Sequence, residues 1–301
     1  MDIRKIQAFA KVYEHASFSK AGKALYLSQP TISAHVASLE QELGLALFDR
    51  IGRTVVPTKA GEILYSHALR IFDAADLALS ELHTLQDRVT GHLDIGGSTI
   101  PANFILPEFL AHFSQEFPEV ILDLHVGDSE EIITAVRDNV LMLGVVGAVL
   151  DSAELVYEPI LQDRLVLVMT PGLYRRFSCS DTAELLRSLP WVMREEGSGT
   201  RLAMITGLAR LGIDVRDLKS VITVRNAGVM SRCIQAEMGA GITSASTVQS
   251  LLEKGLLVAV TVPNLCLERH FYIVYNKRRT LFPAALRLID FLKRHAGPHR
   301  A

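Results

Sequence analysis

The sequence predicts an α+β protein of several domains, with a small helical head, one long helix and a larger α/β body. Its 301 residues are 49% hydrophobic, which is enough to build the buried cores of two or three domains. Helical periodicity dominates residues 3–43, and a heptad pattern follows over residues 58–88. From residue 91 onward, strand and helix patterns alternate, as they do in α/β domains.

The charges of the chain are unevenly divided. The net charge is −2, with 31 Lys and Arg against 33 Asp and Glu, which excludes a protein coated with basic groups. Residues 1–60 nevertheless hold eight basic and five acidic side chains, whereas residues 61–90 hold two and five. A mildly basic head before an acidic segment fits a nucleic-acid-binding module joined to a different domain.

Several classes of protein are not expected. The longest nearly unbroken apolar run, residues 140–150, is far shorter than the ~20 residues that span a bilayer. The first five residues lack an apolar signal core, so we expect a cytoplasmic protein with no membrane partner. The three cysteines, at 179, 233 and 266, have no zinc-ligand spacing, so we expect neither a metal site nor a cofactor. Catalytic motifs are absent, which makes a ligand-converting α/β enzyme the less favoured class.

The head begins with three predicted helices. Residues 3–13 form the first, Ser17 or Ser19 caps a short second one, and Ser28 caps a third with Pro30 in its first turn. The third helix ends at Gly44 and buries one face through Ile32, Val36, Leu39 and Leu43. Its other face carries small and hydrogen-bonding side chains: Gln29, Thr31, Ser33, Ala34, His35 and Ser38.

This polar face has the composition of a helix that reads the major groove of DNA. An amide can bridge an adenine edge, and hydroxyls and methyls can contact thymine or phosphate. An ordinary solvated helix face is the alternative, but such a face usually carries more Lys and Glu. We therefore predict DNA contacts from the cap and first turns of this helix: Ser28, Gln29, Pro30, Thr31, Ser33 and His35.

A hairpin wing is predicted over residues 47–58, where two short apolar arms flank Gly52. Arg50 and Arg53 lie near its tip, and we expect them to contact the DNA backbone. Arg50 could instead pair with Asp49 or Glu40. Residues 1–60 are thus predicted to form a winged helix-turn-helix domain.

The head resembles the N-terminal signature of LysR-type bacterial transcriptional regulators. The resemblance covers about the first 65 residues at fixed spacings: Leu25-x-x-Ser28-Gln29-Pro30-x-x-Ser33, Leu39-Glu40-x-x-Leu43-Gly44-x-x-Leu47-Phe48-x-Arg50 and Thr58-x-Ala60-Gly61. Gly22 departs from it, because the family more often has a second alanine there, and the glycine lowers helix propensity by about 1 kcal/mol. The resemblance implies a regulator that binds double-stranded promoter DNA and a small-molecule effector.

A long helix is predicted from residue 58 to residue 88. Its apolar residues recur at alternating spacings of four and three, as in a heptad seam: Leu64, Ala68, Ile71, Ala75, Ala78, Leu82 and Leu85. At 1.5 Å per residue the rod is about 45 Å long, too long to bury its seam on the head. It could pack on the body of the same chain, but the resemblance implies a linker helix that forms a homodimer, within a homotetramer.

The body is predicted to contain parallel-rich α/β sheets. After a first strand from residue 92, strand patterns cover 121–126, 141–146, 165–169, 191–193, 221–224, 256–262 and 271–275, and helical patterns cover 107–117, 129–139, 202–211, 229–238 and 284–294. Similarity to LysR-type effector domains, residues 91–301, adds a periplasmic-binding-protein-like arrangement of two subdomains. The first would comprise residues 91–162 and 267–301, and the second residues 163–266.

Two loops of the body carry the chemistry of an anion site. Each follows a strand, opens a helix and offers hydroxyls and N–H groups at the positive end of the helix dipole: Gly97, Ser98, Thr99 and Ile100 in the first, and Gly197, Ser198, Gly199, Thr200 and Arg201 in the second. The glycines could instead serve turns and the hydroxyls cap helices. Facing loops would clamp a small anionic effector, and Asn226 is a further candidate.

The second loop also resembles one part of the family more closely. Residues 194–201, Arg-Glu-Glu-Gly-Ser-Gly-Thr-Arg, are similar to a LysR-type subgroup that senses small oxyanions or phosphorylated metabolites, including regulators of sulfur and selenium metabolism and of carbon fixation. The resemblance does not choose between these effectors. Arg201 either neutralises the ligand or pairs with Glu195 or Glu196.

Overall fold

The computed structural model describes residues 2–51, 54–84, 88–177, 182–265 and 267–296, and only the backbone of residues 50, 51, 54, 84 and 182. The chain divides into two compact units, Met1–Leu79 and Ser80–Ala301. The division falls inside helix α4 (Lys59–Thr84), so most of that helix, up to Leu79, belongs to the unit that contains the head, and its last five residues belong to the second unit. Among the described residues, every helix is too short or too polar to cross a lipid bilayer.

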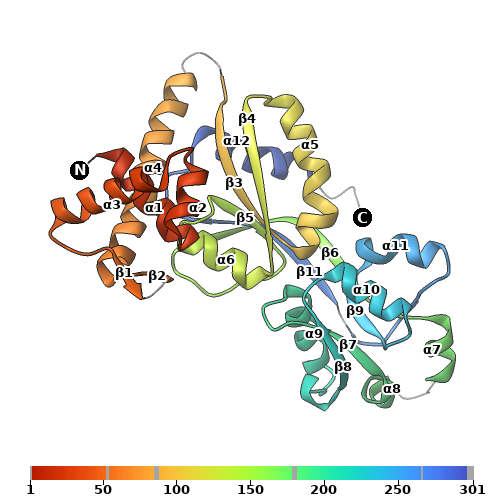
Figure 1. The fold of residues 1–301 in the computed structure, drawn as a ribbon. Helices are drawn as coiled ribbons and strands as arrows, with labels where there is room; N and C mark the ends of the chain where they lie inside the picture. The colour runs from red at the N-terminus through yellow and green to blue at the C-terminus, as the bar shows by residue number, and fades with distance from the viewer. Residues whose placement is uncertain (1, 52–53, 85–87, 178–181, 266, 297–301) are drawn as a thin grey trace. The chain divides into compact units, whose positions relative to one another are not determined.

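The head contains three helices and a two-stranded hairpin (Figure 1): α1 (Ile3–His15), α2 (Phe18–Ala24), α3 (Gln29–Leu43), β1 (Phe48–Ile51) and β2 (Thr54–Pro57). The helix caps follow from the sequence. The Ser17 side chain accepts a hydrogen bond from the Lys20 amide, and Ser28 accepts one from the Thr31 amide. Gly44 ends α3 in the left-handed conformation that glycine adopts without strain, with φ of 65°.

Aromatic side chains hold the head together and dock α4 onto it. The rings of Phe9 and Phe48 lie 5.3 Å apart, and Tyr13 stacks on Tyr65 of α4 at 3.9 Å between ring centroids. Burial raises the pKa of Tyr65 well above its usual range. Leu43, predicted to be buried, is 38% exposed, because the last turn of α3 extends past this core.

The second unit contains two lobes, which we call lobe I (residues 91–162 and 267–296) and lobe II (residues 163–265). Lobe I has a sheet of β3 (Gly91–Ser98), β4 (Val120–Gly127), β5 (Leu143–Val146), β6 (Leu155–Met169) and β11 (Glu268–Asn276), with the π-helical turn η1 (Pro101–Ile105) and helices α5 (Leu106–Glu116), α6 (Ser129–Arg137) and α12 (Pro283–His295). A Cβ atom at Gly96 would meet Ile132 of α6, and one at Gly97 would meet Ala102 of η1. Since neighbouring strand residues face opposite sides, α6 and η1 cover opposite faces of β3.

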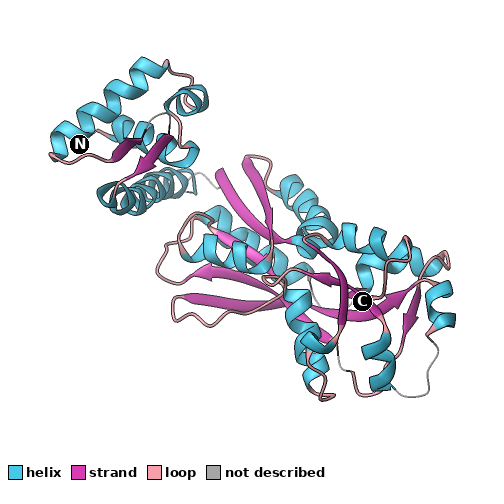
Figure 2. Ribbon diagram, turned by 60° about the horizontal axis from the view of Figure 1, so that its bottom comes forward, coloured by secondary structure: helices cyan, strands magenta, loops and turns pink. Residues whose placement is uncertain are grey.

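Lobe II contains strands of two different sheets; Figure 2 draws strands in magenta and helices in cyan. β7 (Pro190–Arg194) and β8 (Lys219–Val224) form a separate two-stranded sheet, whereas β9 (Gly241–Ser244) and β10 (Val258–Val260) pair with β6 in the seven-stranded sheet. The helical elements of lobe II are α7 (Pro171–Arg176), α8 (Thr182–Ser188), α9 (Gly199–Ala209), the short 3-10 turn η2 (Val215–Asp217), α10 (Ala227–Gln235) and α11 (Ala245–Glu253). The core of lobe II centres on Trp191, which is fully buried and donates a hydrogen bond from Nε1 to the Leu186 carbonyl at 2.8 Å. Helices α7, α8 and α11 have no counterpart among the helical patterns named above.

Two long strands connect the lobes. β6 and β11 pair antiparallel from Leu155 with Asn276 to Arg164 with Glu268, and β6 then continues into lobe II to pair with β9 and β10. The sheets are therefore only partly parallel, in contrast to the prediction, because β11 runs back from lobe II against the direction of β6. Parallel pairs among the described strands are β3 with β4, β3 with β5, and β7 with β8.

Candidate functional site

The first turns of α3 present the residues predicted to read DNA. Gln29 and Pro30 are exposed at its start, whereas Thr31, Ser33 and His35 are half-buried along the same helix. The Ser28 hydroxyl accepts a bond from the Thr31 amide at 3.3 Å and lies 2.8 Å from the Thr31 hydroxyl. Ser28 and Thr31 therefore fix the helix start, and Gln29 and Pro30 form its accessible tip.

The turn before α3 contains a candidate that sequence reasoning missed. Tyr26 is 97% exposed and has φ of 55°, a left-handed conformation that is uncommon outside glycine. Its phenol hydroxyl can donate a hydrogen bond to a phosphate oxygen. The sequence offers no signal for this role, because an exposed tyrosine in a turn has no characteristic spacing.

The hairpin wing has the predicted place in the chain, with Ile51 paired to Thr54 across its tip. Arg53 lies outside the described residues, and the side chain of Arg50 does too. Glu40, one of the alternative partners of Arg50, has a different role. Its carboxylate accepts hydrogen bonds from the amides of Leu47 at 2.7 Å and Phe48 at 3.3 Å, which ties the end of α3 to the start of β1.

The two predicted anion loops meet in a small cavity between the lobes. The cavity measures about 10 Å³, roughly the space of one water molecule, and is lined by five hydroxyls, two guanidinium groups and two further residues: Ser98, Thr99, Ser129, Ser198 and Thr200, then Arg194 and Arg269, then Ile100 and Gly199. Six of the ten predicted effector residues are in this lining. Sequence reasoning missed Ser129, Arg194 and Arg269.

Glycines let the two lobes approach each other closely at this cavity. A Cβ atom at Gly199 would lie 2.6 Å from the Gly147 carbonyl oxygen of lobe I, and one at Gly197 would lie 2.6 Å from the Asp128 carboxylate. Real Cβ atoms do not approach other atoms so closely, so Gly199, which faces backbone, must be glycine in this arrangement, whereas a side chain at 197 would displace the Asp128 carboxylate. The structure therefore has the lobes closed over the site.

Arg194 spans the cleft from lobe II. Its guanidinium is buried, with 3% of the residue exposed, and donates two hydrogen bonds to the Glu195 carboxylate at 2.8 and 2.6 Å. The same group donates to the Thr99 hydroxyl of lobe I at 3.1 Å. Arg194 thus connects the two loops that the sequence analysis singled out.

The second arginine, Arg269, comes from the hinge strand β11. Its Nε donates to the Asp163 carboxylate at 2.8 Å, and Asp163 also accepts from the Ser244 hydroxyl at 2.5 Å. Burial lowers the pKa of Arg269; the Asp163 carboxylate opposes this effect, and the nearby positive charge of Arg194 adds to it. Each of the two guanidinium groups thus has one carboxylate partner, and both groups line the cavity.

Helix termini add to the positive potential. Ser198 caps α9 by accepting a bond from the Arg201 amide, and Asp128 caps α6 in a reciprocal capping box with Glu131. Ser129 and Gly199 are the first residues of these helices, so two helix N-termini adjoin the cavity. Together with the arginines and hydroxyls, they surround the cavity with hydrogen-bond donors, the kind of group that oxyanions and phosphoryl groups bind.

Four predicted effector residues lie outside the cavity lining. Gly97 packs beneath η1, and Gly197 faces Asp128 as described above. Arg201 donates from Nη1 to the Arg194 carbonyl at 2.8 Å and so supports the loop backbone. Asn226 caps α10, where its side chain accepts bonds from two backbone amides. The side chains of Arg201 and Asn226 thus support the backbone, although their places in the sequence suggest contact with a ligand.

A much larger cavity, about 640 Å³, lies between η1, α5, the hinge strands and α11. Its lining is largely apolar, with Phe104, Phe109 and Phe271 among its residues. It also contains three carboxylates (Glu108, Asp163 and Glu253) against the single arginine Arg164. The larger cavity has more room for a ligand, but the basic and hydroxyl groups that suit an anion line the 10 Å³ cavity.

Comparison with known proteins identifies both parts of the chain. Residues 3–62 match the family "Bacterial regulatory helix-turn-helix protein, lysR family", and residues 86–297 match "LysR substrate binding domain". The RuBisCO operon transcriptional regulator of Allochromatium vinosum is 30% identical over 298 residues, which cover 99% of this chain and 97% of that protein. The HTH-type transcriptional regulator YeiE of Escherichia coli (strain K12) is 29% identical over 295 residues, 96% of each chain.

A solved structure has the same fold from end to end. Full-length CbnR complexed with its target DNA matches with a TM-score of 0.67 at 20% identity, covering 98% of this chain and 99% of that one. The family matches include the head that carries α3 and the body that carries the cleft. The chain therefore belongs to the LysR family of transcriptional regulators.

Proposed function

We propose that this regulator binds promoter DNA through α3 and the wing, and that a small anion held between lobes I and II switches its binding or bending of DNA. The observation that carries the effector proposal is the convergence of two buried arginines and five hydroxyls on one small cavity. The fold shared with CbnR, solved with its target DNA, supports the DNA partner. A promoter partner also implies a cytoplasmic location.

The chemistry of the lining suits a compact oxyanion, for which the lobes would part slightly, because the closed cavity holds only about one water molecule. Sulfate, sulfite, selenite and phosphate each present several oxygens to donors from different directions, as the Arg194 and Arg269 guanidinium groups and the surrounding hydroxyls require. A phosphorylated metabolite is the alternative, supported by the similarity to a RuBisCO operon regulator. Its phosphoryl group would occupy the same donors, while the remainder of the molecule would require the lobes to open further.

Ligand binding would act on the balance between open and closed lobes. Because most residues that line the cavity are buried in the closed arrangement, the ligand would enter when the lobes part along β6 and β11. An anion that contacts both lobes favours closure by its differential affinity for the closed state. Closure of the lobes would change DNA binding through α4, which continues into the DNA-binding unit, and so would couple the effector site to the DNA site.

We further propose that α4 pairs with the same helix of a second subunit, in a homodimer that assembles into a homotetramer. Leu82 of the heptad seam is 60% exposed, which suits a residue that a partner covers. Leu82→Glu should therefore shift the sedimentation coefficient toward the monomer. The matched change Glu81→Leu, one residue off the seam, should leave assembly intact.

Thermal stabilisation tests the anion site. A ligand at about 100 times its Kd adds ~2.7 kcal/mol to the folded state, which for a domain of this size raises Tm by roughly 5–10 °C. We expect one or more of sulfate, sulfite, thiosulfate, selenite, phosphate and phosphorylated sugars to do so. Ser98→Ala and Thr200→Ala should abolish the shift, while Thr206→Ala, an exposed threonine on the same helix as Thr200, should not.

The same ligand should be recovered chemically unchanged, as expected of a regulator and not of an enzyme. If both cavity variants kept the full thermal shift, the anion would bind elsewhere, with the 640 Å³ cavity the next place to examine.

Base preference tests the DNA interface. Operators of the parent protein are first selected from random duplexes. Gln29→Ala should bind such an operator about 1–3 kcal/mol more weakly, and its base preference should be relaxed at one base pair. Gln41→Ala, an exposed glutamine near the other end of α3, should bind like the parent protein. An equal loss on every duplex would show that Gln29 contacts only the backbone.

A further inference from the structure

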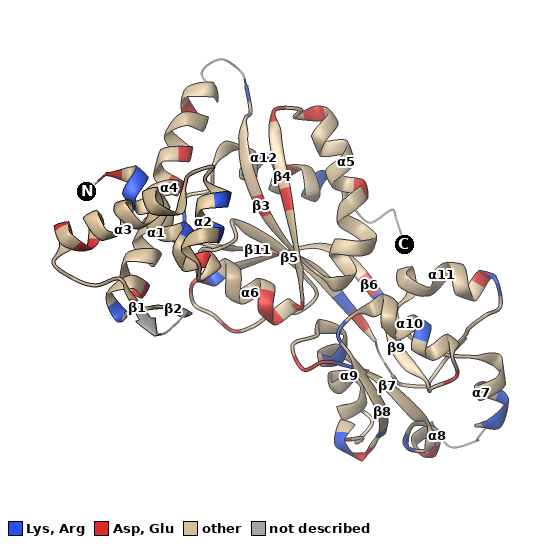
Figure 3. Ribbon diagram, viewed as in Figure 1, with Lys and Arg blue, Asp and Glu red and all other residues tan. Residues whose placement is uncertain are grey.

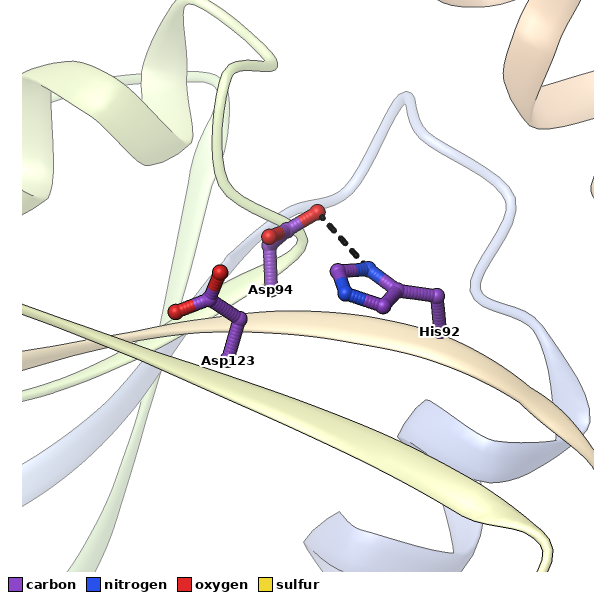
Figure 4. A group of neighbouring side chains, drawn as sticks. All are labelled: His92, Asp94 and Asp123. Atoms are coloured by element: carbon purple, nitrogen blue, oxygen red, sulfur yellow. Dashed lines mark ion pairs between the residues drawn. The ribbon is translucent and has the colours of Figure 1, made fainter. Parts of the chain in front are cut away.

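Two mirrored pairs of metal-ligand side chains lie side by side in lobe I. β3 contains His92 and Asp94, β4 contains Asp123 and His125, and the parallel strands pair Asp94 with Asp123. Residues two apart in a strand project from the same face, so all four side chains share one face of the sheet. Figure 3 shows acidic positions on both strands, and Figure 4 shows three of the four side chains close together.

The distances between polar atoms of His92, Asp94 and Asp123 suit a single small ion, and His125 lies within 3.9 Å of both aspartates. His92 Nδ1 lies 3.6 Å from Asp94 Oδ2, and His125 Nε2 lies 3.3 Å from Asp94 Oδ1 and 3.9 Å from Asp123 Oδ1. One ligand atom each of His92, Asp94 and Asp123 lies within 4.8 Å of the others (Figure 4). Ligands about 2.0–2.2 Å from a tetrahedral zinc ion lie about 3.3–3.6 Å apart. Small rotations of these side chains would therefore complete a coordination shell.

The charges of the cluster also favour a cation. Carboxylates placed directly opposite each other on neighbouring strands repel, and each carboxylate has an imidazole nitrogen of the same cluster within 3.9 Å. The side chains of Asp94 and Asp123 are 42% and 57% exposed, so an ion can reach them from solvent. A divalent ion between them would replace the repulsion by two attractive contacts.

We propose that His92, Asp94, Asp123 and His125 form a site for a divalent transition-metal ion, with zinc the best match to imidazole and carboxylate ligands. The site shares no residue with the anion cavity, so it is an additional function. Sequence spacing indicates no metal site, because spacing rules look for ligands within one segment. Here the two pairs lie on strands 31 residues apart and meet only through the strand register.

The ion would lie beside the joint between lobe I and helix α4. The Thr90 carbonyl accepts a bond from the Ser80 hydroxyl of α4 at 3.3 Å, and the Thr90 hydroxyl lies 2.6 Å from His83 Nδ1. β3 begins at the next residue, and His92 follows. A metal that ties β3 to β4 would therefore hold the start of β3 next to this joint, so metal binding would stiffen the connection between the helix and the lobe.

Metal titration of the full-length protein tests the site. The protein is prepared without a histidine tag, freed of metal by a chelator, and titrated with zinc chloride by calorimetry and with cobalt chloride by visible absorption. We expect saturable binding of one zinc per chain and the strong d–d absorption of cobalt in a non-octahedral site. Asp94→Asn and His125→Ala should each weaken zinc binding at least about tenfold, whereas His112→Ala, an exposed histidine on α5, should not change it.

A stability readout separates loss of the site from loss of the fold. Without metal, Asp94→Asn should have a Tm equal to or above that of the parent protein, since it removes the carboxylate repulsion. With zinc, only the parent and His112→Ala should gain Tm. Parent-like zinc affinity in both Asp94→Asn and His125→Ala, or an absence of saturable binding to the parent, would overturn the proposal.

Discussion

Asp163→Asn should destabilise the effector unit because it leaves the Arg269 charge buried without a counterion. Only 5% of the Asp163 side chain and 9% of the Arg269 side chain are exposed. Asparagine keeps the size of the side chain and an oxygen that can accept from the Ser244 hydroxyl, so the change removes mainly the charge. Breaking a buried ion pair costs about 3–5 kcal/mol, which corresponds to a fall in Tm of roughly 6–20 °C for a unit of this size.

Two further measurements assign the cost to the uncompensated arginine. The double variant Asp163→Asn, Arg269→Met should be more stable than Asp163→Asn alone, because an apolar chain replaces the unpaired charge. Sulfate, compared with chloride at equal ionic strength, should raise the Tm of Asp163→Asn more than that of the parent protein, because Arg269 then has no competing carboxylate. A cost below about 1 kcal/mol, or equal sulfate effects in both proteins, would refute the reasoning.

Two other substitutions test contacts of the fold. Glu40→Ala removes the acceptor of two backbone amides and should accelerate hydrogen exchange at Leu47 and Phe48, with a local loss of about 2–3 kcal/mol; Glu40→Gln should lose less, and unchanged exchange in Glu40→Ala would contradict the contact. Trp191→Phe leaves the buried Leu186 carbonyl without its donor and opens a small cavity, so urea unfolding should show a loss of about 2–4 kcal/mol. A loss under about 1 kcal/mol would mean that the core repacks.

The residues that line the small cavity could be predicted from sequence only where they lie in a recognisable loop. Ser198 and Thr200 belong to a glycine-rich turn that opens a helix, and such turns are identified by composition alone. Ser129 and Arg269 come from a different helix and from the returning hinge strand, and reach the cavity only through the fold. Arg201 illustrates the opposite error, since its place in the turn suggests a ligand contact while its guanidinium supports the Arg194 carbonyl.

The hinge was harder to predict than the lobes. The apolar pattern indicates a strand from residue 165, yet β6 begins ten residues earlier at Leu155. The register with β11 shifts between Phe271, opposite Leu161, and Tyr272, opposite Pro159. This bulge accommodates a proline, which has no N–H for the ladder. A proline and an irregular pairing together hide a continuous strand from any rule based on alternation.

The position of β11 between β5 and β6 has a consequence for synthesis on the ribosome. About 100 residues separate the end of β6 at Met169 from the start of β11 at Glu268. At roughly 5–20 residues per second, they take about 5–20 s to translate. Until β11 emerges, the edges of β5 and β6 that it will join have no strand between them, and such edges promote aggregation. The ribosome must therefore translate all of lobe II before lobe I can complete its sheet, so slower translation of lobe II should prolong the exposure of these edges and lower the yield of the whole protein.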